Sequence, residues 1–298
     1  MSPLIRRIAV LCISTVLLYL AYRQLTLDAG FPLPTSTSST RVEGPVKWKD
    51  IPPKYTVAST IALPTGTPAA IPRIQHKFGV ETQHNKAERL QRQAAVKEAF
   101  LHSWNGYKKH AWLQDEVTPV TGGFTNGFGQ RGATLVDTLD TLAIMGLDEE
   151  FKAAVEAVKG IDFTTSAVSR LNVFETTIRY LGGLLSAYDV SEAKHRVLLD
   201  KAIELGDMFA ALRMYQEADG QGLSAEIGSL TLEFTRLTQL TGDAKYYDAV
   251  ARITALLTKH QDRTKLPGLF PVRVSPARED FSQDNHFTMG VARPAAQH

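Results

Sequence analysis

Two residues of opposite charge lie four positions apart in the segment VFETTIRYLGGLLSAY, namely Glu175 and Arg179. This spacing places both side chains on one face of an α-helix. Apolar residues fill most of the segment and leave little room for a solvated face. A buried glutamate beside an arginine fits acid catalysis or sugar recognition, because burial favours the acid form while the cation favours the carboxylate. The alternative is a surface ion pair worth about 0.3–0.5 kcal/mol.

A second pair of carboxylates, Glu226 and Glu233, lies seven residues apart in SAEIGSLTLEF, and therefore on one helix face. Glu226 either faces a pocket or complements the dipole of a helix that begins just before it. Glu233 is the candidate for a structural partner of a loop or helix end. With Asp115, Asp137 and Asp140, these carboxylates favour glycoside hydrolysis, in which an inverting enzyme holds its acid and base roughly 6.5–9.5 Å apart.

Several other chemistries lack the residues that they need. The sequence has no Walker loop, no G-x-S-x-G elbow and no H-E-x-x-H motif. Its single cysteine, Cys12, excludes an intramolecular disulfide and a cysteine-based zinc site. The net charge of +2, from 33 basic and 31 acidic residues, argues against nucleic acid as a partner.

The elements that must position these residues are helical. Apolar residues recur at helical spacing, and we expect helices over 85–107, 134–145, 149–158, 173–188, 192–212, 224–240 and 244–259. The turn residues Asp148, Asp189 and Asp243 are expected to cap the second helix of each pair. With no convincing strand between them, the repeated pairs predict an all-α array of helical hairpins. The first helix of each pair is the more apolar and is predicted to be buried, while the second faces water.

The first residues of the chain have the composition of a membrane anchor. The span 8–22 carries no charge and is flanked by arginines, which predicts a signal-anchor helix within segment 1–25, with a cytoplasmic N-terminus and the remainder in the lumen. A cleaved signal peptide and a helix of a soluble protein are the alternatives.

The residues between this span and the helical part form a separate region. Eight of the 14 prolines lie between Pro32 and Pro72, and no helical or strand period survives there. Segment 26–80 is therefore expected to be a solvated stem. The folded domain is predicted to occupy residues 81–298.

Long motifs in the domain resemble the class I α-1,2-mannosidases of glycoside hydrolase family 47. They occupy segments 104–116, 133–147, 173–188 and 224–243. The likeness to fungal members extends over roughly residues 45–293. It implies a lumenal (α/α)7 barrel, of which this chain would hold about the first half, on a protein anchored in the membrane of the endoplasmic reticulum or Golgi. It also implies calcium dependence and inverting removal of α-1,2-linked mannose from high-mannose N-glycans.

The resemblance assigns roles to three residues of this sequence. Glu175 matches the catalytic acid of the family's F-E-[ST]-T-I-R motif, and Arg179 matches a residue that contacts the sugar in the terminal mannose subsite. Glu226 matches an active-site carboxylate of the A-E-[VI] motif. No metal ligand is assigned, because the family's calcium-binding threonine has no match in this chain.

The sequence departs from the family in three places. Gln130 and Arg131 stand where fungal relatives are expected to have Gly-Trp, and the loop within 208–223 is shorter. After Arg293, PAAQH replaces the stretch A-D-S-Y-Y-E-Y that supplies a catalytic aspartate, and the glutamate proposed as base has no match. The resemblance therefore predicts a C-terminally truncated mannosidase that is inactive alone. The alternatives are a non-catalytic glycan-binding or quality-control protein and an incomplete gene model.

Overall fold

The computed structural model describes residues 46–47, 59–67, 69–166, 171–212 and 222–288. The span 8–22, most of the shortened loop and the residues after 288 lie outside this description. Within the described ranges, no helix combines the length and the apolar character that crossing a bilayer requires.

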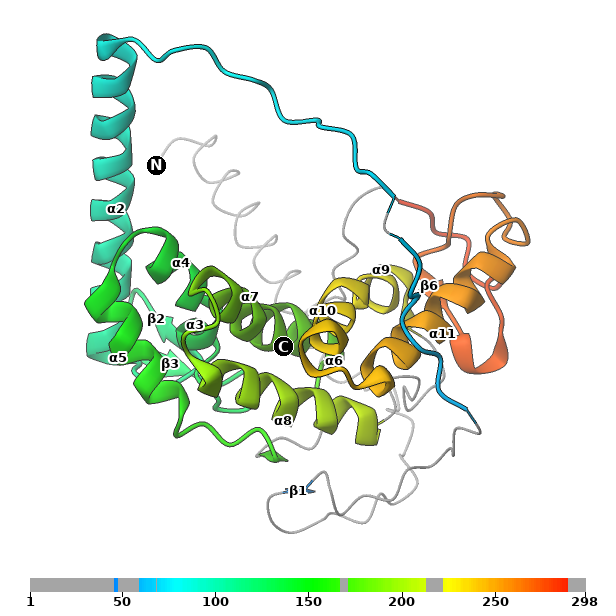
Figure 1. Cartoon of the computed structure of the whole chain (residues 1–298). Coiled ribbons are helices and arrows are strands. Elements are labelled where there is room, and N and C mark those ends of the chain that lie inside the picture. The colour runs from blue at the N-terminus through cyan, green and yellow to red at the C-terminus, as the bar shows by residue number, and fades with distance from the viewer. Residues whose placement is uncertain (1–45, 48–58, 68, 167–170, 213–221, 289–298) are drawn as a thin grey trace, which may run out of the picture. The chain divides into compact units, whose positions relative to one another are not determined.

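The described chain is mostly helical (Figure 1). Its longer helices are α2 (Gln83–His110), α5 (Asp148–Val158), α7 (Gly182–Val190), α8 (Arg196–Leu212), α10 (Thr231–Thr241) and α11 (Ala244–His260). The shorter ones are α3 (Ala133–Asp137), α4 (Leu139–Ile144), α6 (Val173–Thr176), the π-helical turn η2 (Thr177–Leu181), α9 (Ser224–Gly228) and the 3-10 turn η3 (Pro276–Arg278). An all-α architecture is therefore confirmed for the described residues, with short strands as an addition.

Those strands form three small antiparallel sheets that the sequence did not predict. They pair β1 (Val46–Lys47) with β4 (Thr165–Ser166), β2 (Glu116–Thr118) with β3 (Gly123–Thr125), and β5 (Gly222–Leu223) with β6 (Arg273–Val274). In the hairpin of β2 and β3, Val117 lies opposite Phe124. Because each sheet has only two short strands, they fasten loops and do not form a layer of their own.

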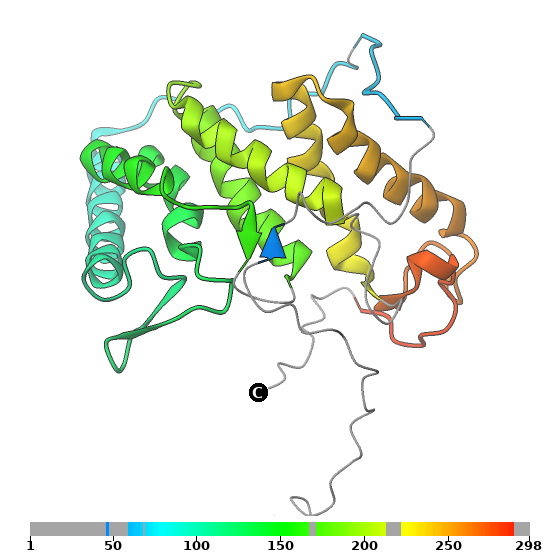
Figure 2. The same ribbon diagram turned by 90° about the horizontal axis from the view of Figure 1, so that it is seen from below.

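The helices pack in two layers (Figures 1 and 2). In one layer α7 contacts α3, α4 and α10, and in the other α8 contacts α5 and α11. The layers join within the pairs α4–α5, α7–α8 and α10–α11, which are the predicted helical hairpins. The first helices provide much of the core. Fully buried side chains there include Leu135, Val136, Leu139, Leu142, Tyr180, Leu181, Leu184 and Leu237.

One glycine sets how closely two helices of the first layer approach. A Cβ atom on Gly183 would lie 2.6 Å from the carbonyl oxygen of Val136. Only a residue without a side chain can therefore bring α7 this near to α3. Asp137, which follows Val136, is thereby held close to the turn that carries Arg179.

The last hairpin follows its predicted capping signals. α10 ends at Gly242, whose φ of 76° is left-handed and whose N–H bonds to the carbonyl of Thr238. Asp243 then accepts a hydrogen bond from the N–H of Lys245 and caps α11, as predicted.

The other two predicted caps are wrong. Asp148 is the first residue of α5 and makes no cap hydrogen bond there, although it stands with two other acidic residues in the first turn. Asp189 lies inside α7 and pairs with Arg236 of α10. The turn comes later, where Glu192 and Ala193 adopt φ values of 55° and 59°, so α8 begins at residue 196 and not 192.

Two further helix predictions need correction. The expected helix 224–240 is broken between α9 and α10, where Gly228 weakens the helix and the hydroxyl of Ser229 bonds back to the carbonyl of Glu226. The expected apolar stripe of α2 is buried only near its C-terminal end. Leu90 and Val96 are 46% and 60% exposed, because the N-terminal half of α2 lies outside the core.

Candidate active site

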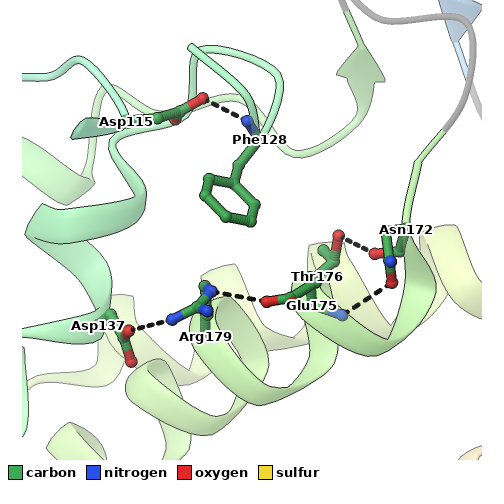
Figure 3. Close-up of polar contacts among 7 residues, drawn as sticks. All are labelled: Asp115, Phe128, Asp137, Asn172, Glu175, Thr176 and Arg179. Carbon is green, nitrogen blue, oxygen red and sulfur yellow. Dashed lines mark hydrogen bonds and ion pairs between the residues drawn. The ribbon is translucent and has the colours of Figure 1, made fainter. Parts of the chain in front are cut away.

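Glu175 lies in the first turn of a helix that Asn172 caps (Figure 3). The Oδ1 atom of Asn172 accepts the N–H of Glu175 at 3.0 Å, and the Oγ1 of Thr176 donates to the carbonyl of Asn172 at 2.7 Å. The first of these bonds satisfies one of the initial N–H groups of the helix, which have no partner within it. Both bonds fix the backbone from which the Glu175 side chain projects.

Arg179 joins carboxylates from two helical segments (Figure 3). Its Nε donates to Oε2 of Glu175 at 2.8 Å, and its Nη1 donates to Oδ2 of Asp137 at 3.2 Å. The three side chains are 30% to 41% exposed, so a ligand can reach them without unfolding anything. The structure therefore places Glu175 and Arg179 together, as the spacing predicted, and adds Asp137 to them.

The turn that carries Arg179 is π-helical. In η2 the hydrogen bonds span five residues, which widens the helix by one residue per turn. Single π-helical turns of this kind occur frequently at functional sites. Here the turn lies between Glu175 and Gly183. The same helix contacts Asp137 through the Arg179 side chain and the backbone of α3 through Gly183.

An aromatic ring covers the arginine on its other side. The guanidinium carbon of Arg179 lies 5.2 Å from the centre of the Phe128 ring, a cation–π distance. Phe128 belongs to the glycine-rich loop that precedes α3, and Figure 3 shows its ring pointing toward Arg179. Nothing in the sequence singled out Phe128, because a loop residue is brought to the site by tertiary structure alone.

Asp115 holds this loop in place and is fully buried. Its carboxylate accepts backbone N–H groups from Phe128, Gln130 and Arg131 at 2.8–2.9 Å, and the hydroxyl of Tyr180 at 3.2 Å. Asp115 was expected among the pocket carboxylates. That expectation is wrong, since its oxygens are used to organise the loop. Asp140 similarly accepts a hydrogen bond from Ser186 at 2.7 Å and links α4 to α7.

Burial opposes ionisation at two of the remaining carboxyls. Burial raises the pKa of Asp137, while the hydrogen bond from Arg179 lowers it. Burial also raises the pKa of Glu226, and the negative charge of Glu175 raises it further. Glu226 is therefore within electrostatic range of Glu175, although no hydrogen bond joins them among the described residues. Glu226 gains no compensating cation in that part of the chain.

Glu233 lies on α10, beyond the break after α9, so the prediction that it shares one helix face with Glu226 is wrong. Its Oε2 is buried and has no hydrogen-bond partner among the described residues, and burial raises its pKa. Its Oε1 lies 3.7 Å from where a Cβ of Gly182 would stand, directly after the π-helical turn. The suggestion that Glu233 is a structural partner of a loop or helix end stays a prediction.

Two hollows on the described surface lie away from these residues. One of about 600 Å³ is lined by α10 and α11, including Thr235 and Tyr247. The other, of about 330 Å³, is lined by residues that include Arg131 and Asp162. Neither hollow is lined by Glu175, Arg179 or Glu226.

The carboxylates around Arg179 do not form a metal site. No group of three or more His, Cys, Asp or Glu side chains in the described ranges is arranged to hold a metal ion. The nearest assembly, Asp137 with Glu175, is already bridged by Arg179, whose positive charge disfavours a cation there. These residues do not fit a calcium centre.

Comparison with known proteins identifies relatives for most of this region. The glycosyl hydrolase family 47 model matches residues 99–293. A mannosyl-oligosaccharide 1,2-α-mannosidase of Arabidopsis thaliana is 39% identical over 67% of this chain and 39% of its own length. A mannosyl-oligosaccharide α-1,2-mannosidase of Penicillium citrinum is 37% identical over 71% of this chain and 44% of its own.

A solved structure agrees with these sequence matches. The α-1,2-mannosidase from Trichoderma reesei superposes with a TM-score of 0.59 at 31% identity, over 66% of this chain and 46% of that one. The chain thus spans about two fifths of the length of the curated relatives it matches. Since the family model covers well over half of the residues, this chain belongs to glycosyl hydrolase family 47.

Proposed function

We propose that the chain carries the proton-donating side of an α-1,2-mannosidase site, in which Glu175 protonates the departing glycosidic oxygen. The observation that carries this proposal is the chain of ion pairs from Glu175 through Arg179 to Asp137, lying open to solvent beside Phe128. Two carboxylates and one guanidinium supply acceptors and donors for sugar hydroxyls, and the ring supplies an apolar surface.

Substrate binding would release Glu175 from the cation. In the absence of sugar, Nε of Arg179 donates to Oε2 of Glu175 at 2.8 Å. Sugar hydroxyls that accept hydrogen bonds from Arg179 draw its donors away from Glu175, which leaves that carboxyl free to face the glycosidic oxygen. Inverting hydrolysis then needs a second carboxylate to activate water on the opposite face of the sugar, about 6.5–9.5 Å away. The described part of the chain offers no residue that we assign to this role.

The partners and location follow the family. We propose high-mannose N-glycans as the ligands, and the membrane of the endoplasmic reticulum or Golgi as the location, with attachment through residues 8–22. The motivation is the uncharged span between arginines. The family resemblance implies calcium, but the described residues do not fit a calcium centre, so no role for the ion is proposed in this chain.

The test is release of mannose from an α-1,2-linked disaccharide by the purified chain, alongside binding measured by calorimetry. Binding without release, weakened by Glu175→Gln and by Arg179→Ala, supports a glycan-binding protein that keeps half of the site. Release that Glu175→Gln abolishes supports hydrolysis. A folded sample that neither binds nor releases mannose contradicts both functions.

A further inference from the structure

Residues of the predicted stem bind to the last helix of the described chain. The N–H of Ile61 donates to Oδ1 of Asp248 at 2.8 Å, and Nη2 of Arg252 donates to the carbonyl oxygen of Ser59 at 2.7 Å. The two contacts join positions 187 and 193 residues apart, and both involve the backbone of the N-terminal segment. A solvated stem would make no such bonds, so this short segment departs from the expectation for residues 26–80.

The geometry is that of a strand binding to its neighbour. The two backbone groups used are the C=O of one residue and the N–H of the residue two positions later, on either side of Thr60. In a parallel sheet, a single residue of one strand bonds to the C=O of one residue and to the N–H of the residue two positions later on the adjacent strand. Asp248 supplies the acceptor and Arg252 supplies the donor, in place of a partner strand's C=O and N–H.

An ion pair fixes the side chains of Asp248 and Arg252 relative to each other. They lie four positions apart on α11, and Nε of Arg252 bonds to both carboxylate oxygens of Asp248 at 3.0–3.1 Å. Asp248 is 6% exposed, whereas Arg252 keeps about two fifths of its side chain in solvent. Because the bonded atoms of the segment are backbone atoms, the contact depends on extended conformation more than on the identity of Thr60.

We propose that Asp248 and Arg252 form a docking site for one extended backbone segment, and that its occupant is Ser59–Ile61 of the same chain. The segment is then part of the folded unit. From Ile61 the chain runs to Thr82, the cap of α2, which lies at the other end of the helical layers (Figure 1). Residues 59–67 and 69–82 are here called the N-terminal arm. The docking site attaches this arm to the last hairpin, α10–α11, while α2 attaches it to the first hairpin, α4–α5.

The experiment is hydrogen exchange on the full chain. Hydrogen bonds to charged groups contribute about 1.5–3 kcal/mol, which corresponds to roughly 10- to 100-fold slower exchange of the Ile61 amide than of an exposed amide. The reference amide is that of Ile74, which is 91% exposed in the same arm. Equal exchange of the two amides in the unaltered protein overturns the proposal.

A matched pair of substitutions separates docking from folding. Ile61→Pro removes the donor without altering α11, and Ile74→Pro makes the same change where no hydrogen bond is present among the described contacts. We expect Ile61→Pro to raise protease cleavage within 59–67 about tenfold or more, and Ile74→Pro to leave cleavage there unchanged. Equal cleavage in both variants contradicts the proposal. Arg252→Ala should also release the segment, and amide protection within α11 shows whether that variant remains folded.

Discussion

The two groups of carboxylates on the first helical layer differ in how their charge is compensated. Glu175 and Asp137 share one guanidinium, with N–O distances of 2.8 and 3.2 Å. Glu226 and Glu233, on α9 and α10, have no ion pair among the described residues, and burial raises the pKa of both. The two groups thus differ in their ion pairing, although burial raises the pKa of Asp137 as well.

The difference shows what a single cation contributes. Arg179 bonds to both Glu175 and Asp137, and its hydrogen bond lowers the pKa of Asp137 against the effect of burial. On the other side no cation opposes burial among the described residues, and the pKa of Glu226 and of Glu233 is raised. A neutral carboxyl can donate a hydrogen bond to a sugar oxygen, which an ionised one cannot.

The largest expected effect comes from disturbing the helix contact that brings Asp137 to Arg179. Gly183→Ala places a methyl group 2.6 Å from the carbonyl oxygen of Val136, and backbone cannot easily move away. We expect the free energy of unfolding to fall by about 3 kcal/mol, the upper part of the range for overpacked sites. Chemical denaturation measures this change.

The neighbouring Gly182→Ala is the matched control. Its added methyl group would have its nearest contacts at 3.6–3.7 Å, an ordinary van der Waals distance. Equal losses of stability in Gly182→Ala and Gly183→Ala would show that the close approach of α7 and α3 is not the cause.

The second prediction removes the shared cation. Arg179→Ala leaves Glu175 and Asp137 as two carboxylates without their bridge, and it removes a donor to the sugar. We expect affinity for an α-1,2-linked mannose disaccharide to fall at least tenfold, about 1.4 kcal/mol. Titration calorimetry measures it. Arg236→Ala, which breaks a comparable pair with Asp189 away from the site, should leave affinity unchanged.

The third prediction concerns the cap that fixes Glu175. Asn172→Ala removes the acceptor for the Glu175 N–H and should lower the free energy of unfolding by about 1 kcal/mol. Asn172→Asp retains an acceptor and should restore most of that loss. If the aspartate variant is as unstable as the alanine variant, the side-chain cap is not what stabilises this helix start.

The smallest effect is a change in pH dependence. Burial raises the pKa of Glu233 above its usual 4.5, so the folded state binds its proton more tightly than the unfolded state. Stability from this group is present below pH 4.5 and is lost as pH rises through the raised pKa. Relative to Glu233→Gln, the unaltered protein should therefore lose stability with rising pH. Glu149→Gln, at a side chain 88% exposed, is the control and should show no such difference.

The sequence predicted those features of the site that depend on local spacing. The pair of Glu175 and Arg179 follows from four-residue spacing, and the cap at Asp243 follows from a Gly-Asp turn. Asn172, directly before the helix, is also a residue type that caps helices, and this signal was available but not used.

Features that depend on distant contacts were not predictable in this way. Phe128 reaches Arg179 only because the buried Asp115 collects several loop N–H groups. Aspartate is a residue type that is common in turns. Asp189 nevertheless lies inside a helix, where it pairs with Arg236, 47 positions away. The periodicity of a sequence indicates which face of a single helix is apolar, but it does not indicate which other helix packs against that face.

The π-helical turn η2 has a consequence for how this segment tolerates insertions and deletions. A π turn accommodates one residue more than an α turn, so losing one residue from 177–181 would allow ordinary α-helical winding. Each residue of an α-helix rotates the chain by about 100°. Such a shortened helix could keep Gly183 against α3, and Glu175 and Arg179 would still lie three or four positions apart on one helix face. What the loss of a residue would change is the angle at which Arg179 meets Asp137, because the residues of the turn would be wound more tightly.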